Sequence, residues 1–251
     1  MGLKLLINSL FRGGAEKQFA ALARLLPHDS LILLENVIAQ PADASKIKIL
    51  SGHTSATSSL VKTASIPLYA RRLAAAVRPG DTVLSFMERA NIVNVLAAKR
   101  SGHRAVICER TSPSGEFSGL RGALMRPLIR RQYPRAALVV ANSAGVKKDL
   151  VENFGVPAEK ISVLHNGCDI SGIAALAAAP LPAGWAPVFE RPVVVAGGRL
   201  TAAKGHWHLL RIFKELKKTN SGAALVLLGE GELRSYLVRL SAGLGLKTFS
   251  G

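Results

Sequence analysis

GGRLTAAKG, residues 197–205, follows the apolar run 192–196 and precedes a predicted helix that begins near Lys204. This is the order of a strand, a glycine turn and a helix. Backbone N–H groups can approach an anion at such a turn, and the helix N-terminus stabilises the anion by about 0.3 to 1 kcal/mol. Because Arg199 and Lys204 add two cations, the stretch predicts a diphosphate site. An ordinary βα loop with two solvated basic residues would show the same pattern.

The residues that follow repeat the strand-and-turn pattern. The helix continues through 205–213, an apolar run at 223–228 predicts a second strand, and GEGELR at 229–234 opens another helix. This order of motifs resembles the C-terminal domain of family 4 retaining glycosyltransferases. The resemblance implies that Arg199 and Lys204 hold the diphosphate of a nucleotide-sugar donor. It also implies that the second glycine turn lies near the nucleoside, with donor contacts from Gly229, Gly231, Glu232 and Leu233.

The N-terminus carries a related pattern. An apolar run at 3–8 is followed by RGGAE at 12–16 and by a predicted amphipathic helix, whose buried face is expected to hold Phe19, Leu22, Leu25 and Leu26. A double glycine between a strand and a helix favours an anion-accepting turn, although a tight turn requires glycine for steric reasons alone. Gly-Gly-Ala-Glu after the first strand is common in the family. The resemblance therefore adds Gly13 and Gly14 to the donor-binding residues.

Apolar runs and helical segments alternate through the first half of the chain. Strands are predicted at 82–86, 105–108, 137–141 and 161–164, and helices at 66–77, 90–101, 120–131 and 144–154. Continuous apolar strands between helices indicate an α/β fold with a parallel sheet covered on both faces. The resemblance implies a GT-B-like arrangement. We expect a complete Rossmann-like domain at 1–174, a linker at 175–191 and the first part of a second Rossmann-like domain at 192–251.

The charge of the chain favours polyanionic partners. Lys and Arg total 33 against 16 Asp and Glu, which gives a formal net charge of +17. Nucleic acid, an anionic membrane surface and phosphorylated substrates all suit such a charge. Only 5% of residues are aromatic and no nucleic-acid-binding module is recognisable, so we expect no specific nucleic-acid partner.

The basic residues are concentrated in the segment 117–135, which contains no Asp or Glu. It interleaves apolar side chains with five arginines, Arg121, Arg126, Arg130, Arg131 and Arg135. An amphipathic, arginine-rich helix suits the headgroup region of anionic lipids. A helix that packs on the core and exposes a solvated basic face fits the same sequence, and Pro127 would limit or kink the helix. The resemblance favours the membrane, because family members acting on lipid-linked acceptors often dock through a basic N-terminal surface.

Two polar loops follow predicted strands and are candidates for the acceptor side. Glu88 comes directly after the strand at 82–86, and Glu109 and Arg110 come directly after the strand at 105–108. Ligands of open α/β sheets bind at the carboxyl ends of the strands, so these side chains could orient acceptor hydroxyls. The alternative is that each glutamate pairs with a neighbouring arginine on the surface.

The remaining composition argues against a metal centre and a membrane span. The two cysteines, Cys108 and Cys168, are far apart in sequence, and we expect neither a disulfide nor a zinc site. No apolar run reaches the roughly 18 residues of a transmembrane helix, and the first residues lead into a strand rather than a signal peptide. We expect a cytoplasmic protein, peripheral on the inner face of the membrane. The resemblance implies a donor site that needs no metal or other cofactor.

One family motif is absent from the 251 residues. Family 4 enzymes carry a Glu-x7-Glu motif later in the C-terminal domain, which contacts the ribose and the transferred sugar. The resemblance therefore implies a truncated, inactive form of a glycosyltransferase that moves a sugar from a nucleotide sugar, with a UDP-sugar expected, to a lipid-linked or polysaccharide acceptor of the cell envelope. The alternative is a noncatalytic basic protein that binds anionic membrane or nucleic acid.

Overall fold

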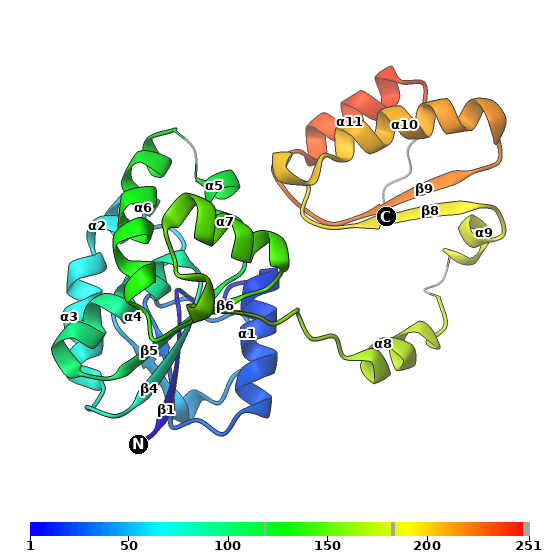
Figure 1. Ribbon diagram of the computed structural model, residues 1–251. Helices are drawn as coiled ribbons and strands as arrows, with labels where there is room; N and C mark the ends of the chain where they lie inside the picture. Colours follow the sequence, from blue (N-terminus) through cyan, green and yellow to red (C-terminus); the bar gives the residue numbers. More distant parts are fainter. Residues whose placement is uncertain (118, 182–183, 248–251) are drawn as a thin grey trace. The chain divides into compact units, whose positions relative to one another are not determined.

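The computed structural model describes residues 1–117, 119–181 and 184–247, and the chain divides into two compact units, Met1–Cys168 and Asp169–Gly251 (Figure 1). The second unit thus starts at Asp169, ahead of the position predicted from sequence. Two helices, α8 (Ile170–Ala177) and α9 (Ala186–Phe189), form in or beside the stretch predicted as a linker.

The first unit is built on a seven-stranded parallel sheet with the strand order β3-β2-β1-β4-β5-β6-β7. The strands are β1 (Leu3–Ile7), β2 (Ser30–Leu33), β3 (Ile47–Ile49), β4 (Thr82–Phe86), β5 (Arg104–Glu109), β6 (Leu138–Ala141) and β7 (Ile161–Val163). In the register, Leu5 lies beside Leu31 of β2 on one side and beside Leu84 of β4 on the other. The strand order reverses direction between β1 and β4, and ligands of doubly wound folds bind outside the carboxyl ends of strands at such a point.

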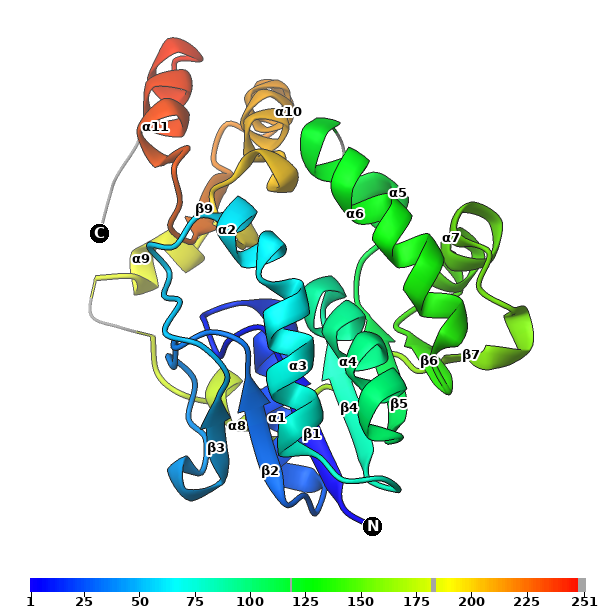
Figure 2. The same cartoon turned by 90° about the vertical axis from the view of Figure 1, so that its left-hand side faces the viewer.

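Helices cover both faces of this sheet, as predicted. They are α1 (Gly14–Leu25), α2 (Ser59–Ala64), α3 (Ile66–Ala76), α4 (Glu88–Ser101), α5 (Pro113–Glu116), α6 (Gly119–Gln132) and α7 (Ala144–Phe154), and single 3₁₀ turns form at Ala44–Lys46, Tyr133–Arg135 and Ala158–Lys160. Figure 2 shows α3 and α4 in front of the strands and α1 behind them. Alternate residues of each strand pack on opposite faces of the sheet. Leu6 and Ile32 pack in the core with Tyr69 of α3, whereas Leu5 and Ile7 pack with Phe19 of α1.

The second unit contains a pair of parallel strands, β8 (Val193–Gly197) and β9 (Ala224–Leu228). Their helices are α10 (His206–Thr219) and α11 (Arg234–Gly243), with a short 3₁₀ turn at Ala202–Lys204. Both helices lie over the same side of the strand pair (Figure 1). The small core of this unit is formed by Leu200, Leu210 and Leu237, while Val195 is 51% exposed. The second unit therefore buries far less apolar surface than the first.

Local signals predicted most element boundaries in the first unit. Ser143 accepts a hydrogen bond from the Val146 N–H as the N-cap of α7, and Gly155 ends that helix in the left-handed conformation. The prediction for α1 was wrong at Leu25, whose side chain is 79% exposed because it lies in the last turn, beyond the sheet-facing positions of Phe19 and Leu22. β2, β3 and α2 were not predicted from the sequence.

Candidate donor and acceptor sites

The turn after β8 joins the strand to α10 as the sequence predicts. Gly198 has φ 156° and Gly205 has φ 63°, conformations that favour glycine, and Gly205 is the N-cap of α10. Between them, the buried side chain of Leu200 anchors the turn in the small core. The turn is therefore held at both ends by glycine and fixed in the middle by an apolar side chain.

Arg199 and Lys204 are both exposed on this turn. A Cβ placed on Gly198 would lie 3.8 to 3.9 Å from the aliphatic carbons of Lys204, so the lysine stem runs over the glycine. Among the described residues, neither cation takes part in an ion pair. Two charges without an ion-pair partner among the described residues thus lie beside a glycine backbone and a helix start, which is the arrangement that attracts an anion.

The second glycine turn packs directly on the first. The N–H of Leu200 donates to the carbonyl of Glu230 at 2.9 Å, and the N–H of Leu233 donates back to the carbonyl of Leu200 at 2.9 Å. A Cβ on Gly229 would overlap the Gly198 carbonyl oxygen, and one on Gly231 would lie 2.5 Å from the Leu200 carbonyl oxygen. Gly229 and Gly231 therefore allow the two turns to meet backbone to backbone. Glu232 is exposed beside them, whereas Leu233 joins the core.

In the first unit, the carboxyl ends of β1 and β4 form the point where strand order reverses. The Asn8 side-chain oxygen accepts a hydrogen bond from the Ala90 N–H at 3.0 Å, which ties the end of β1 to the start of α4. Met87, between β4 and α4, has φ 75°, a backbone conformation that costs a non-glycine residue about 1 to 3 kcal/mol. Strain of this kind concentrates at functional sites, and here it sets the direction in which α4 leaves the sheet.

Gly13 and Gly14 lie at the start of α1, close to the end of β1, as predicted. A Cβ on Gly13 would overlap the carboxylate of Glu16, which sits against the turn and is buried. The negative carboxylate offsets the positive end of the helix, so this turn is a weaker anion site than its glycines suggest. Whether Gly13 and Gly14 contact the donor stays a prediction.

The structure gives the three acceptor-side candidates different environments. Glu88 is mostly buried and accepts a hydrogen bond from Arg121 at 3.1 Å, so it is paired with an arginine distant in sequence rather than with its neighbour. Arg110 is half-buried, stacks over the Phe86 ring at 5.1 Å and donates to the Asn166 side chain. Arg110 therefore links the ends of β4 and β5 to the loop after β7.

Glu109 is buried within the first unit. Its side chain accepts a hydrogen bond from the Tyr133 hydroxyl at 2.6 Å and another from the Arg110 N–H at 2.9 Å. Burial raises its pKa from the ordinary 4.5 to about 7, and the Tyr133 hydrogen bond opposes the shift. With 1% of its surface exposed, Glu109 is placed to fix the loop that carries Arg110.

A buried ion cluster that the sequence analysis missed lies beside the same strand ends. Glu35, just after β2, accepts from Lys62 at 2.7 Å and from Arg89 at 2.7 Å. All three residues are buried, and the Nε of Arg89 has no hydrogen-bond partner in the described residues. Lys62 and Arg89 lie 27 and 54 residues after Glu35 in the sequence, so no local sequence signal could have revealed the cluster. It holds the start of α4 against β2.

Helix α6 matches the predicted helix at 120–131 and continues past Pro127. Its apolar side chains Met125 and Ile129 are buried, as the core-packing alternative requires. Several of its cations are used inside the unit: Arg126 donates to the Ser114 carbonyl at 2.6 Å and Arg130 to the Asn153 carbonyl at 2.9 Å. Arg131 and Arg135 remain exposed at the far end of the segment.

The described residues contain neither a group of metal-binding side chains nor a helix that could cross a membrane. Within 1–117, 119–181 and 184–247, no cluster of three or more His, Cys, Asp or Glu side chains is arranged to hold a metal ion. In the same ranges, every helix is too short or too polar to cross a membrane.

Comparison with known proteins relates this chain to a protein family and to two named relatives. The family model for glycosyltransferase family 4 matches residues 12–171. A Campylobacter jejuni relative, N-acetylgalactosamine-N,N'-diacetylbacillosaminyl-diphospho-undecaprenol 4-alpha-N-acetylgalactosaminyltransferase, is 30% identical over 254 residues, covering 98% of this chain and 67% of the relative. An uncharacterized Methanocaldococcus jannaschii glycosyltransferase is 25% identical over 176 residues, 66% of this chain and 43% of that protein.

Solved structures agree on the fold. Anabaena HepE in complex with UDP superposes with a TM-score of 0.70 at 21% identity, over 98% of this chain and 67% of HepE. An E. coli trehalose-6-phosphate structure bound with UDP-2-fluoro glucose gives a TM-score of 0.70 at 12% identity, over 96% of this chain and 70% of that one. These matches confirm the GT-B-like α/β fold. The family match over the greater part of the first unit, together with the 30% identical relative, shows that the chain belongs to glycosyltransferase family 4.

Proposed function

We propose that this chain binds the diphosphate of a nucleotide sugar, with a UDP-sugar as donor, and serves transfer of the sugar to a lipid-linked acceptor with retention at the anomeric carbon. The observation that carries the proposal is the pair of exposed cations Arg199 and Lys204 on one glycine turn, neither of which has an ion-pair partner in the part of the chain that the structure describes. The UDP bound to HepE and the diphospho-undecaprenol in the name of the Campylobacter relative support the choice of donor and acceptor. The relatives are longer than this chain, so the activity proposed is that of a whole family member.

The proposed chemistry is electrostatic. When the bond to the sugar breaks, negative charge accumulates on the departing diphosphate. Fixed cations and backbone N–H groups at the turn stabilise that charge without reorganising during the reaction. In this proposal Arg199 and Lys204 supply the positive charge in place of a metal ion, and the turn at 229–233 lies beside the nucleoside. On the acceptor side, Arg110 and Glu88 stand at the strand ends and orient the acceptor.

Calorimetric titration of UDP into the 251-residue chain tests the donor proposal. Arg199→Ala and Lys204→Ala are each expected to weaken UDP binding by about 1.5 to 3 kcal/mol, because each removes a charge-assisted contact with the diphosphate. Lys214→Ala is the matched control, since this exposed lysine lies in the same unit on α10. Equal affinities for the wild type and both turn variants would refute the assignment.

We propose further that the segment 117–135 contacts an anionic membrane surface. Arg131 and Arg135 are exposed at its end. Burial, and then the charges of Arg135 and Arg131, lower the pKa of Lys99 on α4. Like charges that influence one another in this way suit a surface of anionic headgroups.

Vesicle binding tests the membrane proposal. Vesicles with anionic lipid are expected to retain the protein in a salt-sensitive way, and Arg131→Gln with Arg135→Gln is expected to weaken retention by about 1 kcal/mol for each charge removed. Lys148→Gln, an exposed lysine on α7, is the control for net charge. Retention that falls as much for the one charge removed in the control as for each charge removed from the segment would show that total charge, rather than this segment, holds the protein on the membrane.

A further inference from the structure

Glu109 is a buried carboxyl group that lacks a counter-charge. It ends β5 with 1% of its surface exposed, and in residues 1–117, 119–181 and 184–247 no cation forms an ion pair with it. The guanidinium of the neighbouring Arg110 stacks over Phe86 and donates to Asn166 instead. A buried negative charge without a cation is costly, so Glu109 takes up a proton more readily than an exposed glutamate.

Four hydrogen-bond donors surround the two carboxyl oxygens of Glu109. Oε1 accepts from the Arg110 N–H at 2.9 Å and from the N–H and hydroxyl of Thr111 at 3.3 and 3.4 Å. Oε2 accepts from the Tyr133 hydroxyl at 2.6 Å. A carboxylate can accept all four bonds, whereas a carboxylic acid carries a hydrogen of its own. Protonation therefore adds a hydrogen to a cluster of donors, and at least one contact must break or reverse.

A chain of buried hydrogen bonds fixes the Tyr133 side of this cluster. It runs through His103, Asn94, Ser85, Asn91 and Tyr133, with successive donor–acceptor distances of 2.8, 3.0, 2.8 and 3.2 Å. The first donor is the His103 Nε2, because the Asn94 side-chain oxygen can only accept. At each later step the residue nearer His103 donates, so every bond of the chain points toward Glu109. Bonds aligned in this way strengthen one another in a protein interior.

The loop that follows Glu109 is the side of the cluster that can yield. Arg110 is half-buried and Thr111 is exposed, so water can replace the carboxylate as acceptor for their N–H groups. The Tyr133 hydroxyl is buried, and its neighbour in the chain, the Asn91 amide, is itself a donor. A proton on Glu109 is therefore expected on Oε1, where it displaces the Arg110 and Thr111 N–H groups.

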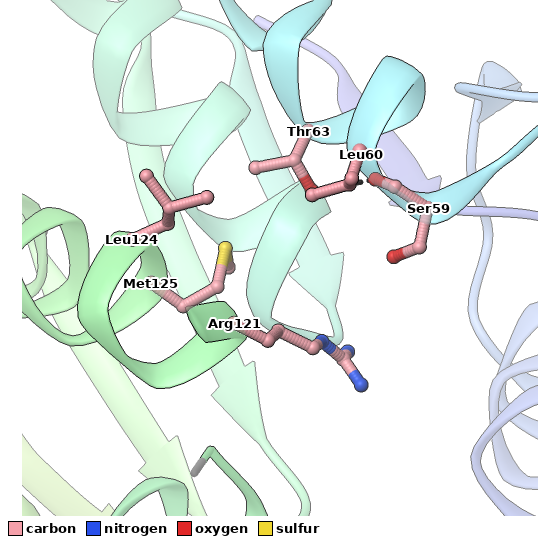
Figure 3. Close-up of a pocket in the computed structure, with 6 residues that line it drawn as sticks. All are labelled: Ser59, Leu60, Thr63, Arg121, Leu124 and Met125. Atoms are coloured by element: carbon pink, nitrogen blue, oxygen red, sulfur yellow. Dashed lines mark hydrogen bonds between the residues drawn. The ribbon is translucent and has the colours of Figure 1, made fainter. Parts of the chain in front are cut away.

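The charged groups that face Glu109 bring its titration close to neutral pH. Burial, and then repulsion from the Glu88 carboxylate on α4, raise the pKa of Glu109 to about 7 against the hydrogen bond from Tyr133. Glu88 is paired at 3.1 Å with Arg121 of α6, which also lines a pocket between α2 and α6 (Figure 3). Both forms of Glu109 are thus populated near neutral pH.

The other titratable groups near Glu109 and its chain stay neutral in that range. Burial raises the pKa of the Cys108 thiol to about 12 and lowers the pKa of His103 from 6.5 to about 4. Burial also raises the pKa of the Tyr133 hydroxyl well above 10. The neighbouring strands β4 and β6 contain no ionisable side chain. The chain therefore keeps its direction while Glu109 gains or loses its proton.

We propose that Glu109 is a proton-controlled latch for the loop at 110–112. Its carboxylate holds the Arg110 and Thr111 N–H groups, whereas its protonated form releases them. Because Arg110 links the ends of β4 and β5 to the loop after β7, release loosens the contact of Arg110 with Phe86 and Asn166. The latch goes beyond the proposed function, since it sets the shape of this edge of the sheet whatever ligand binds there.

Nuclear magnetic resonance of the 251-residue chain tests the latch. The carbon-13 shift of the Glu109 carboxyl group is expected to titrate with a midpoint at about pH 7. The Arg110 and Thr111 amides are expected to be protected from hydrogen exchange about tenfold less at one pH unit below the midpoint than at one unit above it, because each unit changes the ratio of the two forms tenfold. Protection is taken relative to the unfolded chain at the same pH.

The Ser114 amide is the reference within the same segment. It donates to the Asp149 carboxylate at 3.1 Å rather than to Glu109. Burial opposes the shift, but hydrogen bonds from Ser112 and Ser114 lower the pKa of Asp149 below its ordinary 3.8. The Ser114 amide is therefore expected to keep its protection across the titration of Glu109.

Three variants separate the latch from a general effect of pH. Tyr133→Phe removes a hydrogen bond to the carboxylate and is expected to raise the midpoint by about one to two pH units. Glu88→Gln removes the repelling charge and is expected to lower the midpoint. Glu109→Gln does not titrate and is expected to make the protection of both amides independent of pH. Glu152→Gln is the control, since this glutamate is exposed on α7, and it is expected to shift nothing.

The remaining outcomes overturn the latch. A Glu109 midpoint near its ordinary 4.5 would show that burial does not bring its titration to neutral pH. Protection of Arg110 and Thr111 that ignores the titration of Glu109 would show that its charge does not hold the loop. A loss of protection shared by Ser114 would show that the whole segment loosens at low pH. Because the wild type and the Tyr133 and Glu88 variants give opposite shifts, the test stands even if Glu109→Gln does not fold.

Discussion

Replacing Glu35 by alanine is expected to lower the free energy of unfolding of the first unit by about 3 to 5 kcal/mol. Glu35 is 5% exposed and pairs at 2.7 Å with both Lys62 and Arg89. Its removal leaves two buried cations without a counter-charge, and burying an unpaired charge is far more costly than losing one surface contact. The loss should also loosen the start of α4, because both Arg89 and Glu88 lie in its first turn.

Urea unfolding monitored by circular dichroism measures this effect. Asp29→Ala is the matched control, because Asp29 also pairs with a lysine at 2.7 Å but its side chain is 55% exposed. The control is expected to change stability little, since exposed pairs are screened by solvent. Equal stabilities for the two variants would show that the Glu35 cluster does not stabilise the fold.

Replacing Gly229 by alanine is expected to destabilise the second unit by about 2 to 6 kcal/mol. Gly229 has φ 155°, and its Cβ would overlap the carbonyl oxygen of Gly198. The conformation alone costs a non-glycine residue about 1 to 3 kcal/mol, and forcing backbone atoms apart costs about as much again. The substitution should separate the two glycine turns and displace Arg199 and Lys204 from the proposed diphosphate.

The hydrogen-exchange rates of the Leu200 and Leu233 amides measure this separation directly, because each amide donates a hydrogen bond from one turn to the other. Gly243→Ala is the control: it lies at the end of α11, and its Cβ would meet nothing within 4 Å. The control is expected to keep both amides protected. Protection that persists in Gly229→Ala would contradict the close packing of the turns.

The parts of the fold that the sequence predicts are those with local causes. The strand at 193–197, its glycine turn and α10 follow from an apolar run, positive-φ glycines and an amphipathic pattern that lie within a short stretch. The same holds for α7, whose capping serine and terminal glycine are visible in the sequence. Such features need no knowledge of distant residues.

The strands and side-chain pairings that were not predicted depend on contacts between residues distant in sequence. β3 has three residues, one of them Lys48, and becomes a strand only because β2 supplies its hydrogen-bonding partner. Glu88 and Glu109 lie at the carboxyl ends of β4 and β5, where the sequence placed them, but their partners Arg121 and Tyr133 lie 33 and 24 residues away. Sequence order therefore indicated which edge of the sheet carries these side chains, and tertiary contacts decided which partner each side chain binds.

The difference in affinity between UDP and UMP, taken in the wild type and in the Arg199→Ala, Lys204→Ala double variant, measures directly whether the turn at 197–205 holds a diphosphate. The two nucleotides differ by the β-phosphate that the turn at 197–205 is proposed to hold. We predict that the wild type binds UDP more tightly than UMP, and that the double variant binds both equally, because its diphosphate contacts are gone. A preference for UDP that persists undiminished in the double variant would show that Arg199 and Lys204 do not hold the diphosphate.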